Sequence, residues 1–362
     1  MKILIVENDS VTFGFRKELI DTLLEDNELG LVGDFNNEIT SFYEDKLKLY
    51  PVKTELKSKN IFKNAKLKKT YRKIIGEFNP DVLLTFTIKP NIYCNLKKNN
   101  CITIANITGL GSAFNKNGLL KSLVVHLYKK SFKNIMYVMF QNEGGLECFK
   151  ANKITVNNYS IIPGSGINDE KYQLLPLDNH KGVNFLFPSR PIEQKGFYLL
   201  LNAIPDVIKN NSDAHFVFLG NLDENARKHI EKLEKDVLDH IKFHPFEKDI
   251  VKHYKECDFV VSPSFYNEGI SNVLLEALAC GRPIITTNDN YGCKEVLQEG
   301  VNGFGVKSRN IDSLVNALNK ACQTSKDQIE KMGKSGRDFV IKNFNRKTTI
   351  QTYLDTIKKC VK

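Results

Sequence analysis

The chain contains no tryptophan, and its eight cysteines form no Cys-x-x-Cys pair. Cysteines scattered in this way indicate neither a zinc site nor a disulfide framework, and they fit a reducing compartment. The sequence also lacks an uninterrupted apolar run of about 18 residues, so no membrane-spanning helix is expected. The apolar run 3–6 is followed at once by Glu7 and Asp9, which predicts a first strand rather than a signal peptide.

Motifs for common cofactors and nucleophiles are missing as well. Neither half of the chain has an intact Gly-x-Gly-x-x-Gly after its first predicted strand, so a nicotinamide or flavin would lack its usual phosphate-binding turn. The histidines have no metal-ligand spacing, and no Ser/His/Asp or Cys/His set can be assembled. We therefore expect neither a metal nor a cofactor.

Charge is distributed unevenly along the chain. Residues 1–50 carry a net charge of −6, whereas residues 51–150 carry +13. Such a basic excess attracts nucleic acid or an anionic membrane surface. Nucleic acid is not favoured as a partner, because the sequence has no helix-turn-helix, zinc-finger or aromatic sheet motif.

Part of this basic charge surrounds a stretch with helical apolar spacing. The apolar members are Leu119, Leu120, Leu123, Val124, Leu127 and Tyr128. The basic residues of the region are Lys63, Lys66, Lys68, Lys69, Arg72, Lys73, Lys121, Lys129, Lys130 and Lys133. An amphipathic basic helix can lie on anionic lipid. The alternative is a helix that faces the core and carries solvated lysines.

Short apolar runs alternate with helical patterns along the whole chain, which indicates parallel α/β sheets. Its 362 residues fit two domains. We expect an N-terminal Rossmann-like domain over 1–165, a C-terminal one over 180–345, and a last helix over 346–362. The pattern also predicts a single helix over 222–238 and a helix over 269–280.

The most informative segment runs from Ser264 to Pro283. It places Glu268 directly before Gly269, and Glu276 eight positions after Glu268, on the predicted helix. A helix N-terminus attracts anions through its free N–H groups and its dipole. Acids beside such an end can hold the hydroxyls of a sugar or ribose while the backbone holds phosphate, which suits a nucleotide-sugar. The alternative is that both acids only solvate a helix.

A second cluster follows the first strand of the second half. Arg190 and Lys195 lie five positions apart, at a turn that opens a helix. A rigid guanidinium and a compact ammonium at such a turn can contact a diphosphate from two sides. The alternative is a solvent-exposed turn.

These segments resemble the retaining GT-B glycosyltransferases of the large family typified by bacterial capsule and O-antigen enzymes (glycosyl transferases group 1, family 4). The continuation from Ala277 through Gly281 to Ile285 matches that family's usual pattern. The resemblance implies two Rossmann-like domains facing across a cleft, with the last helix packed on the first domain. It also implies a UDP-sugar donor and no metal, since the chain has no Asp-x-Asp motif of the kind that metal-dependent GT-A enzymes use.

The resemblance further implies roles in a donor site. Glu268 would contact the donor sugar and Glu276 the donor ribose, while Arg190 and Lys195 would neutralise the leaving diphosphate. The other implied donor-site residues, which hold phosphate or line the nucleobase pocket through backbone atoms, are Gly269, Ile270, Ser271, Asn272 and Phe246.

In the first domain the resemblance points to three loops that follow strands. Many family members place a histidine in the third of these loops, and Thr108 stands roughly at that place here, which puts a histidine-based role in doubt. For Arg16 a solvated helix position is the alternative. The acceptor and diphosphate candidates are Gly14, Arg16, Lys89, Thr108, Gly109 and Gly111.

The sequence thus predicts a retaining, metal-independent hexosyltransferase at the cytoplasmic, inner face of the cell membrane, bound there peripherally. It would move an N-acetylhexosamine or hexose from a UDP-sugar to a polyprenyl-diphosphate-linked saccharide in surface polysaccharide biosynthesis. No carboxylate nucleophile can be placed on the acceptor side, so front-face displacement is the simplest mechanism. Two alternatives stay open: a UDP-sugar epimerase on the same fold, and a basic membrane or nucleic-acid binding module with a degenerate cleft.

Overall fold

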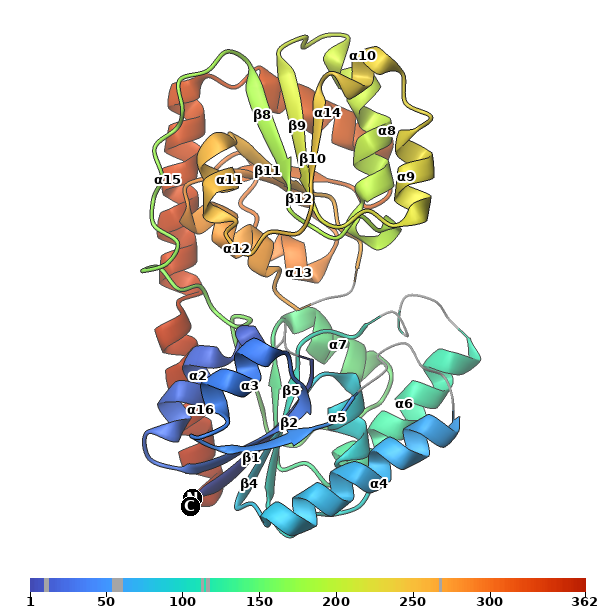
Figure 1. The fold of residues 1–362 in the computed structure, drawn as a ribbon, viewed down its shortest axis with the longest axis vertical. Helices are drawn as coiled ribbons and strands as arrows, with labels where there is room; N and C mark the ends of the chain where they lie inside the picture. The colour runs from blue at the N-terminus through green and yellow to red at the C-terminus, as the bar shows by residue number, and fades with distance from the viewer. Residues whose placement is uncertain (10–12, 54–60, 112–113, 115–117, 267–268) are drawn as a thin grey trace. The chain divides into compact units, whose positions relative to one another are not determined.

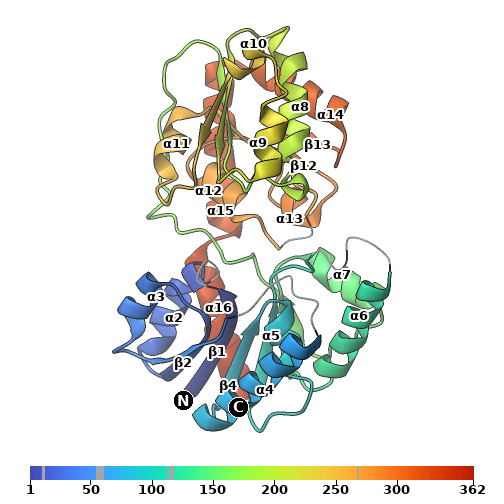
Figure 2. The ribbon, with the colours of Figure 1, turned by 45° about the vertical axis from the view of Figure 1, so that its right-hand side comes forward.

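The computed structural model describes residues 1–9, 13–53, 61–111, 114, 118–266 and 269–362 (Figure 1). The chain divides into unit 1, which comprises Met1–Ser165 and Lys347–Lys362, and unit 2, which comprises Gly166–Arg346. Each unit has one parallel sheet with helices against both faces, as Figures 1 and 2 show. This confirms the doubly wound α/β fold class that the alternating pattern predicted.

The described part of unit 1 has a seven-stranded sheet in the order β3-β2-β1-β4-β5-β6-β7. The strands are β1 (Lys2–Asp9), β2 (Glu28–Asp34), β3 (Lys48–Pro51), β4 (Val82–Phe86), β5 (Ile102–Ile107), β6 (Tyr137–Phe140) and β7 (Tyr159–Ile161). The helices are α2 (Lys17–Leu24), α3 (Asn37–Tyr43), α4 (Ile61–Phe78), α5 (Ile88–Tyr93), α6 (Leu119–Phe132), α7 (Glu143–Ala151) and α16 (Arg346–Val361).

Alternation along β1 shows how both faces of this sheet are covered. Successive side chains of a strand point to opposite faces. Ile3 and Ile5 pack with residues of α2 and α16, whereas Leu4 and Val6 pack with the apolar stripe of α4. The stripe of α4 recurs every three or four positions, as one face of a helix does, and consists of Leu67, Tyr71, Ile74 and Phe78.

The described part of unit 2 has a six-stranded sheet in the order β10-β9-β8-β11-β12-β13. The strands are β8 (Val183–Phe187), β9 (Ala214–Leu219), β10 (Ile241–His244), β11 (Phe259–Ser262), β12 (Ile284–Thr287) and β13 (Gly303–Val306). The helices are η2 (Glu193–Lys195), α8 (Phe197–Ile208), α9 (Glu224–Ile230), α10 (Lys235–Leu238), α11 (Val251–Glu256), α12 (Asn272–Ala279), α13 (Tyr291–Lys294), α14 (Ile311–Cys322) and α15 (Lys326–Asn343).

The single helix predicted over 222–238 was wrong, because the structure has α9 and α10 there. The chain turns between them, and the Leu233 amide donates to the Ile230 carbonyl at 3.0 Å. This break places Val237 in the core, where it is 5% exposed and belongs to the same apolar cluster as α8. Tertiary packing therefore overrides a continuous helical pattern.

A buried guanidinium joins several segments of unit 2. Arg282 is fully buried and donates to five described backbone carbonyls. Their distances are 2.5 Å for Tyr254, 2.7 Å for Pro176, 3.1 Å for Leu175, 3.3 Å for Gly281 and 3.4 Å for Lys255. Two of these carbonyls end α11, where the helix dipole also favours a cation. Arg282 thus holds α11, the end of α12 and the segment 175–176 together.

We predict that Arg282→Ala destabilises the protein by about 3 kcal/mol or more, because buried carbonyls lose their donor and a cavity remains. Urea denaturation followed by circular dichroism measures this loss. Arg227→Ala is the matched control, since Arg227 is exposed on α9. Equal stability of both variants would contradict the central role of Arg282.

Candidate functional site

The strand order of unit 2 indicates where a ligand binds. The sheet extends from β8 to β9 and β10, and the chain then returns to place β11 on the other side of β8. In parallel α/β sheets, ligands bind beyond the carboxyl ends of the strands at such a reversal. The loop after β8 carries Arg190 and Lys195, and the loop after β11 leads into α12. The structure therefore brings both sequence motifs to one edge.

Gly196 determines the turn that presents Lys195. Its φ of 78° is left-handed, which glycine adopts at little cost. A β-carbon on Gly196 would lie 2.5 Å from the carbonyl oxygen of Pro263. Lys195 Nζ lies 6.0 Å from the ring centroid of Tyr266, and Arg190 is exposed. Because α8 begins directly after this turn, its dipole adds positive potential beside Lys195.

The loop after β11 is held by hydrogen bonds to the segments that follow the two neighbouring strands, β8 and β12. Ser264 Oγ and the Phe265 amide donate to the carbonyl of Gln194, at 3.3 and 3.0 Å. Asn290 Nδ2 donates to the carbonyls of Ser264 and Tyr266, at 3.1 and 2.8 Å. Gln194 and Asn290 could not be predicted from the sequence, because contacts between separate loops leave no local pattern.

Helix α12 begins beside this loop with its first amides uncapped by a side chain. Ser271 is the N-cap residue, and its side chain makes no capping hydrogen bond within the described residues. Gly269, Ile270 and Ser271 are buried, and Asn272 is the first residue of the helix. The positive end of a helix dipole at such a start suits an anion. Glu268 lies outside the described residues, so its role stays a prediction.

Glu276 lies on the second turn of α12 beside two phenols. Tyr254 Oη donates to Glu276 Oε2 at 3.3 Å, and Tyr172 belongs to the same buried cluster as Leu275 of α12. Burial raises the pKa of Glu276, although the two phenols and the charges of Lys171 and Arg346 act in the opposite direction. The residue as a whole is not fully buried, so a ligand at the start of α12 can approach it. Neither tyrosine was predicted from the sequence.

Phe246 lies at the outer end of the same edge, after β10. Its side chain is 69% exposed, and its amide donates to Asn221 Oδ1 at 3.1 Å. The next residue, Glu247, pairs with Lys252 and lies 3.3 Å from His253 Nε2. Hydrogen bonding to Lys252 holds the pKa of Glu247 below its usual value. The backbone beside Phe246 is therefore held in place while its ring remains available for contact.

Unit 1 has the corresponding reversal between β1 and β4. Glu7, at the end of β1, is fully buried, and its Oε2 lies 3.7 Å from Arg16 Nε. The Arg16 guanidinium lies 4.6 Å from the Phe86 ring centroid. Arg16 is only 5% exposed, so the solvated-helix alternative was wrong. Nearby, Asn106 donates to the Tyr353 hydroxyl of α16. Glu7 was missed as a site residue because a buried acid cannot be told from a solvated one by sequence.

The loops after β1, β4 and β5 keep exposed or partly exposed residues at this edge. Thr87, directly after β4, has a φ of 65°. This is an outlier for a β-branched residue, and such strain often occurs at functional sites. The predicted acceptor-loop residues that are exposed or partly exposed here are Gly14, Lys89, Thr108, Gly109 and Gly111.

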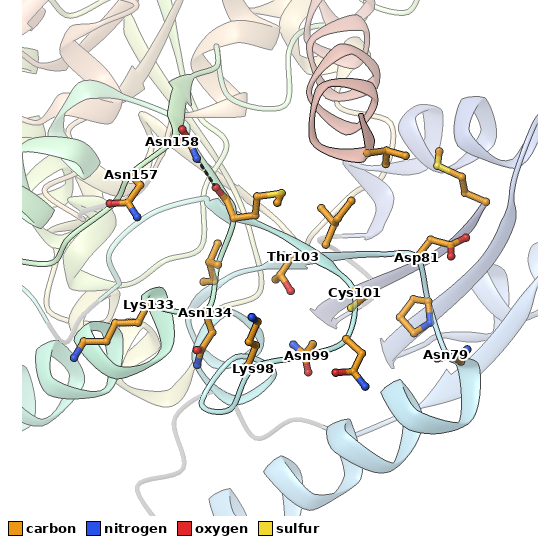
Figure 3. Close-up of a pocket in the computed structure, with 17 residues that line it drawn as sticks. Asn79, Asp81, Lys98, Asn99, Cys101, Thr103, Lys133, Asn134, Asn157 and Asn158 are labelled. Carbon is orange, nitrogen blue, oxygen red and sulfur yellow. Dashed lines mark hydrogen bonds between the residues drawn. The ribbon is translucent and has the colours of Figure 1, made fainter.

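Unit 1 also has a hollow of about 1010 Å³ at the amino ends of β4, β5 and β6 (Figure 3). Asp81 Oδ2 accepts from the Lys2 amide at 2.7 Å, and Asn158 Nδ2 donates to the Met136 carbonyl at 3.2 Å. Some of the polar side chains that line the hollow therefore bond to the protein's own backbone. Because the hollow lies opposite the carboxyl ends of the strands, we do not assign it to the site.

Helix α6 ends in the core and begins at the surface. Tyr128 and Phe132 are buried, whereas Leu119, Leu120 and Leu123 are 92%, 43% and 56% exposed. The core-facing alternative therefore holds only for the second half of the helix. We call Leu119, Leu120 and Leu123 the α6 leucine surface. No helix in the described part of the chain has the length and apolar character needed to cross a bilayer.

Comparison with known proteins identifies related sequences for both halves. The model of the family "Glycosyl transferases group 1" matches residues 176–339, and "Glycosyl transferase 4-like" matches residues 2–142. Spore coat protein SA of Bacillus subtilis is 33% identical over 205 residues, which span 54% of this chain and about half, 53%, of that protein. The N,N'-diacetylbacillosaminyl-diphospho-undecaprenol alpha-1,3-N-acetylgalactosaminyltransferase of Campylobacter jejuni is 26% identical over 278 residues, or 71% of this chain and 70% of that enzyme.

Solved structures share the fold at low sequence identity. Anabaena HepE, solved with UDP and glucose, has a TM-score of 0.79 and 17% identity, with 99% of this chain and 100% of HepE covered. Sucrose-phosphate synthase of Thermosynechococcus elongatus has a TM-score of 0.82 and 15% identity, with 99% and 98% covered. The two family models together match most of the chain, which therefore belongs to the glycosyl transferases group 1 family and has the GT-B fold.

Proposed function

We propose that this glycosyltransferase moves a sugar from a UDP-sugar to a lipid-linked saccharide with retention of anomeric configuration. The observation that carries the proposal is the meeting, at the β8/β11 edge, of the Lys195 turn, the uncapped start of α12 and Glu276. Two parts of a nucleoside diphosphate sugar find complementary partners there: the diphosphate with Lys195, Arg190 and the start of α12, and the ribose with Glu276. The name of the Campylobacter relative supports a lipid-linked acceptor.

The chemistry needs charge stabilisation at the leaving diphosphate. As the bond between the sugar C1 and the phosphate oxygen breaks, its electron pair passes to that oxygen. Lys195, Arg190 and the helix amides stabilise this growing charge, so the reaction proceeds without a metal. The acceptor hydroxyl attacks C1 from the same face and gives its proton to the departing phosphate oxygen. Glu268 orients the donor sugar.

The acceptor would reach the protein at the inner face of a membrane. The α6 leucine surface supports this part of the proposal, because exposed contiguous apolar side chains mark interaction sites. Basic residues such as Lys129 and Lys130 lie on the same helix, and Lys66 and Lys69 are exposed on α4. Apolar insertion combined with basic charge suits an anionic lipid surface.

Because Glu276 is assigned to the ribose and Glu268 to the donor sugar, replacing each one should affect UDP binding differently. Glu276→Ala weakens UDP binding by about 1.5–3 kcal/mol, because the ribose hydroxyls lose a charged acceptor. Glu268→Ala leaves UDP binding intact but suppresses transfer, because it acts on the sugar. Calorimetry with UDP measures the first effect and a transfer assay the second. Equal loss of UDP affinity in both variants would contradict the assignment.

The proposed role of Lys195 predicts an effect on turnover. Lys195→Ala lowers kcat more than it raises the donor KM, because the charge on the diphosphate grows toward the transition state. Activity persists in excess EDTA. Lys209→Ala is the matched control, since Lys209 lies at the far end of α8 in an exposed pair with Asp206. Complete, reversible inhibition by EDTA would mean that a metal carries this charge.

The membrane proposal predicts binding to anionic vesicles. The protein pellets with them at low ionic strength and is released at high salt, because each lysine near the surface contributes on the order of 1 kcal/mol and is screened. Leu119→Ser combined with Leu123→Ser weakens pelleting even at low salt, because the apolar contribution adds to the electrostatic one and is not screened. Val301→Ser, at an exposed position of unit 2, has no effect. If the native protein does not pellet with anionic vesicles at low salt, the membrane proposal is wrong and a soluble acceptor is the better hypothesis.

A further inference from the structure

The loop after β13 holds an arginine in a strained backbone conformation. Arg309 has a φ of 57°, in the left-handed region that glycine adopts freely but that costs free energy for a residue with a large side chain. The loop leaves the carboxyl end of β13, so it lies at the same edge of the sheet as Arg190 and Lys195. Strained residues of this kind cluster at functional sites. The strain at Arg309 therefore calls for a reason in what its side chain contacts.

The residues on both sides of Arg309 keep the strained turn in place. The amide and Oγ of Ser308 donate to the Asp289 carboxylate, at 3.1 and 2.5 Å. Asn310 Oδ1 accepts from the Ser313 amide at 2.7 Å and thereby caps α14. One neighbour is thus tied to the loop after β12 and the other to α14. Because of these bonds, the backbone of Arg309 cannot relax without disturbing both.

The side chain of Arg309 lies over an aromatic ring of the loop after β11. Its Cζ is 4.3 Å from the ring centroid of Phe265. The next residue, Tyr266, has Lys195 Nζ at 6.0 Å from its own ring centroid, and the Phe265 amide donates to the carbonyl of Gln194. Two neighbouring rings of the loop that leads to α12 therefore each lie beside a cation, one from the loop after β8 and one from the loop after β13.

The stacked guanidinium keeps its hydrogen-bond donors available. A guanidinium that packs its flat face on a ring directs its N–H groups outward in its own plane. Arg309 is exposed, and within the part of the chain that the structure describes its guanidinium has no hydrogen bond and no ion pair. Stacking also restricts the side chain before a ligand arrives. A cation held in this way suits an anion that accepts two hydrogen bonds side by side.

We propose that Arg309 is a further substrate-binding residue of this edge, whose guanidinium pairs with a negatively charged group of the bound nucleotide-sugar. The inference rests on the proposed function, because it takes the edge at β8 and β11 as the donor site. Two groups of such a donor have the required charge. One is the diphosphate, which every nucleoside diphosphate sugar carries, and the other is the carboxylate of a donor whose sugar is a uronic acid. In the second case Arg309 selects the class of sugar.

The test compares the wild type with Arg309→Gln and Arg309→Gly by calorimetry with UDP, UDP-glucose and UDP-glucuronic acid. Glutamine keeps a planar polar group but removes the charge, and glycine also relieves the strain, so the fold is retained. Both variants should bind at least one of the three ligands about tenfold more weakly, because a charge-assisted hydrogen bond is lost. The difference from the wild type should shrink at high salt. Lys153→Gly is the matched control and should bind as the wild type does, since exposed Lys153 of unit 1 has a φ of 54°.

The three ligands distinguish the two anionic groups. Weaker binding of all three assigns Arg309 to the diphosphate, whereas weaker binding of UDP-glucuronic acid alone assigns it to a sugar carboxylate. If Arg309→Gln binds all three as the wild type does, the inference is overturned even where Arg309→Gly binds more weakly, because Arg309 then only shapes the loop. The proposed function stands in that case. A wild type that binds none of the three ligands would overturn the proposed function, and the inference with it.

Discussion

The buried Arg282 guanidinium is the interaction on which the packing of unit 2 depends. It is fully buried and its described partners are backbone carbonyls from α11, from the end of α12 and from the segment before β8. A buried cation costs free energy unless its donors are satisfied, so these three segments can pack only in the arrangement that satisfies it. Glu276 lies six positions before Arg282 on α12. The hydrogen bond that it accepts from Tyr254 follows from that arrangement.

Two close backbone contacts, each at a glycine, also hold the elements of unit 2 together. A β-carbon on Gly333 of α15 would lie 2.1 Å from the carbonyl oxygen of Gly281, so α15 and α12 approach through their backbones. A β-carbon on Gly196 would similarly meet Pro263. The first contact positions the helix that bears Glu276, and the second joins the loops of β8 and β11. The turn that presents Lys195 and the loop that leads into α12 are thus held together at one edge of the sheet.

Charge is used differently in the two units. In unit 2 the cations at the sheet edge are exposed or partly exposed, as a site for a charged ligand requires. In unit 1, Arg16 is buried against Glu7 and Phe86, so it supports the strand ends rather than meeting solvent. Removal of one partner from such a buried pair is costly, and the pair therefore favours a single conformation of the loop edge. Exposed basic residues of unit 1 include Lys66 and Lys69 on α4 and Lys130 on α6, the helix that carries the α6 leucine surface.

The sequence by itself determined the fold class, the family and the local motifs. Alternating periods predicted the two parallel sheets, and Arg190, Lys195 and the segment from Glu268 to Glu276 could be recognised because each motif lies within one turn and its helix. Only the tertiary structure decided that Arg16 is buried, that Glu7 is its partner, that 222–238 is two helices, and that Gln194 and Asn290 support the loop after β11. These outcomes depend on contacts between segments distant in the chain, and burial and hydrogen bonding at such contacts override what local spacing alone can specify.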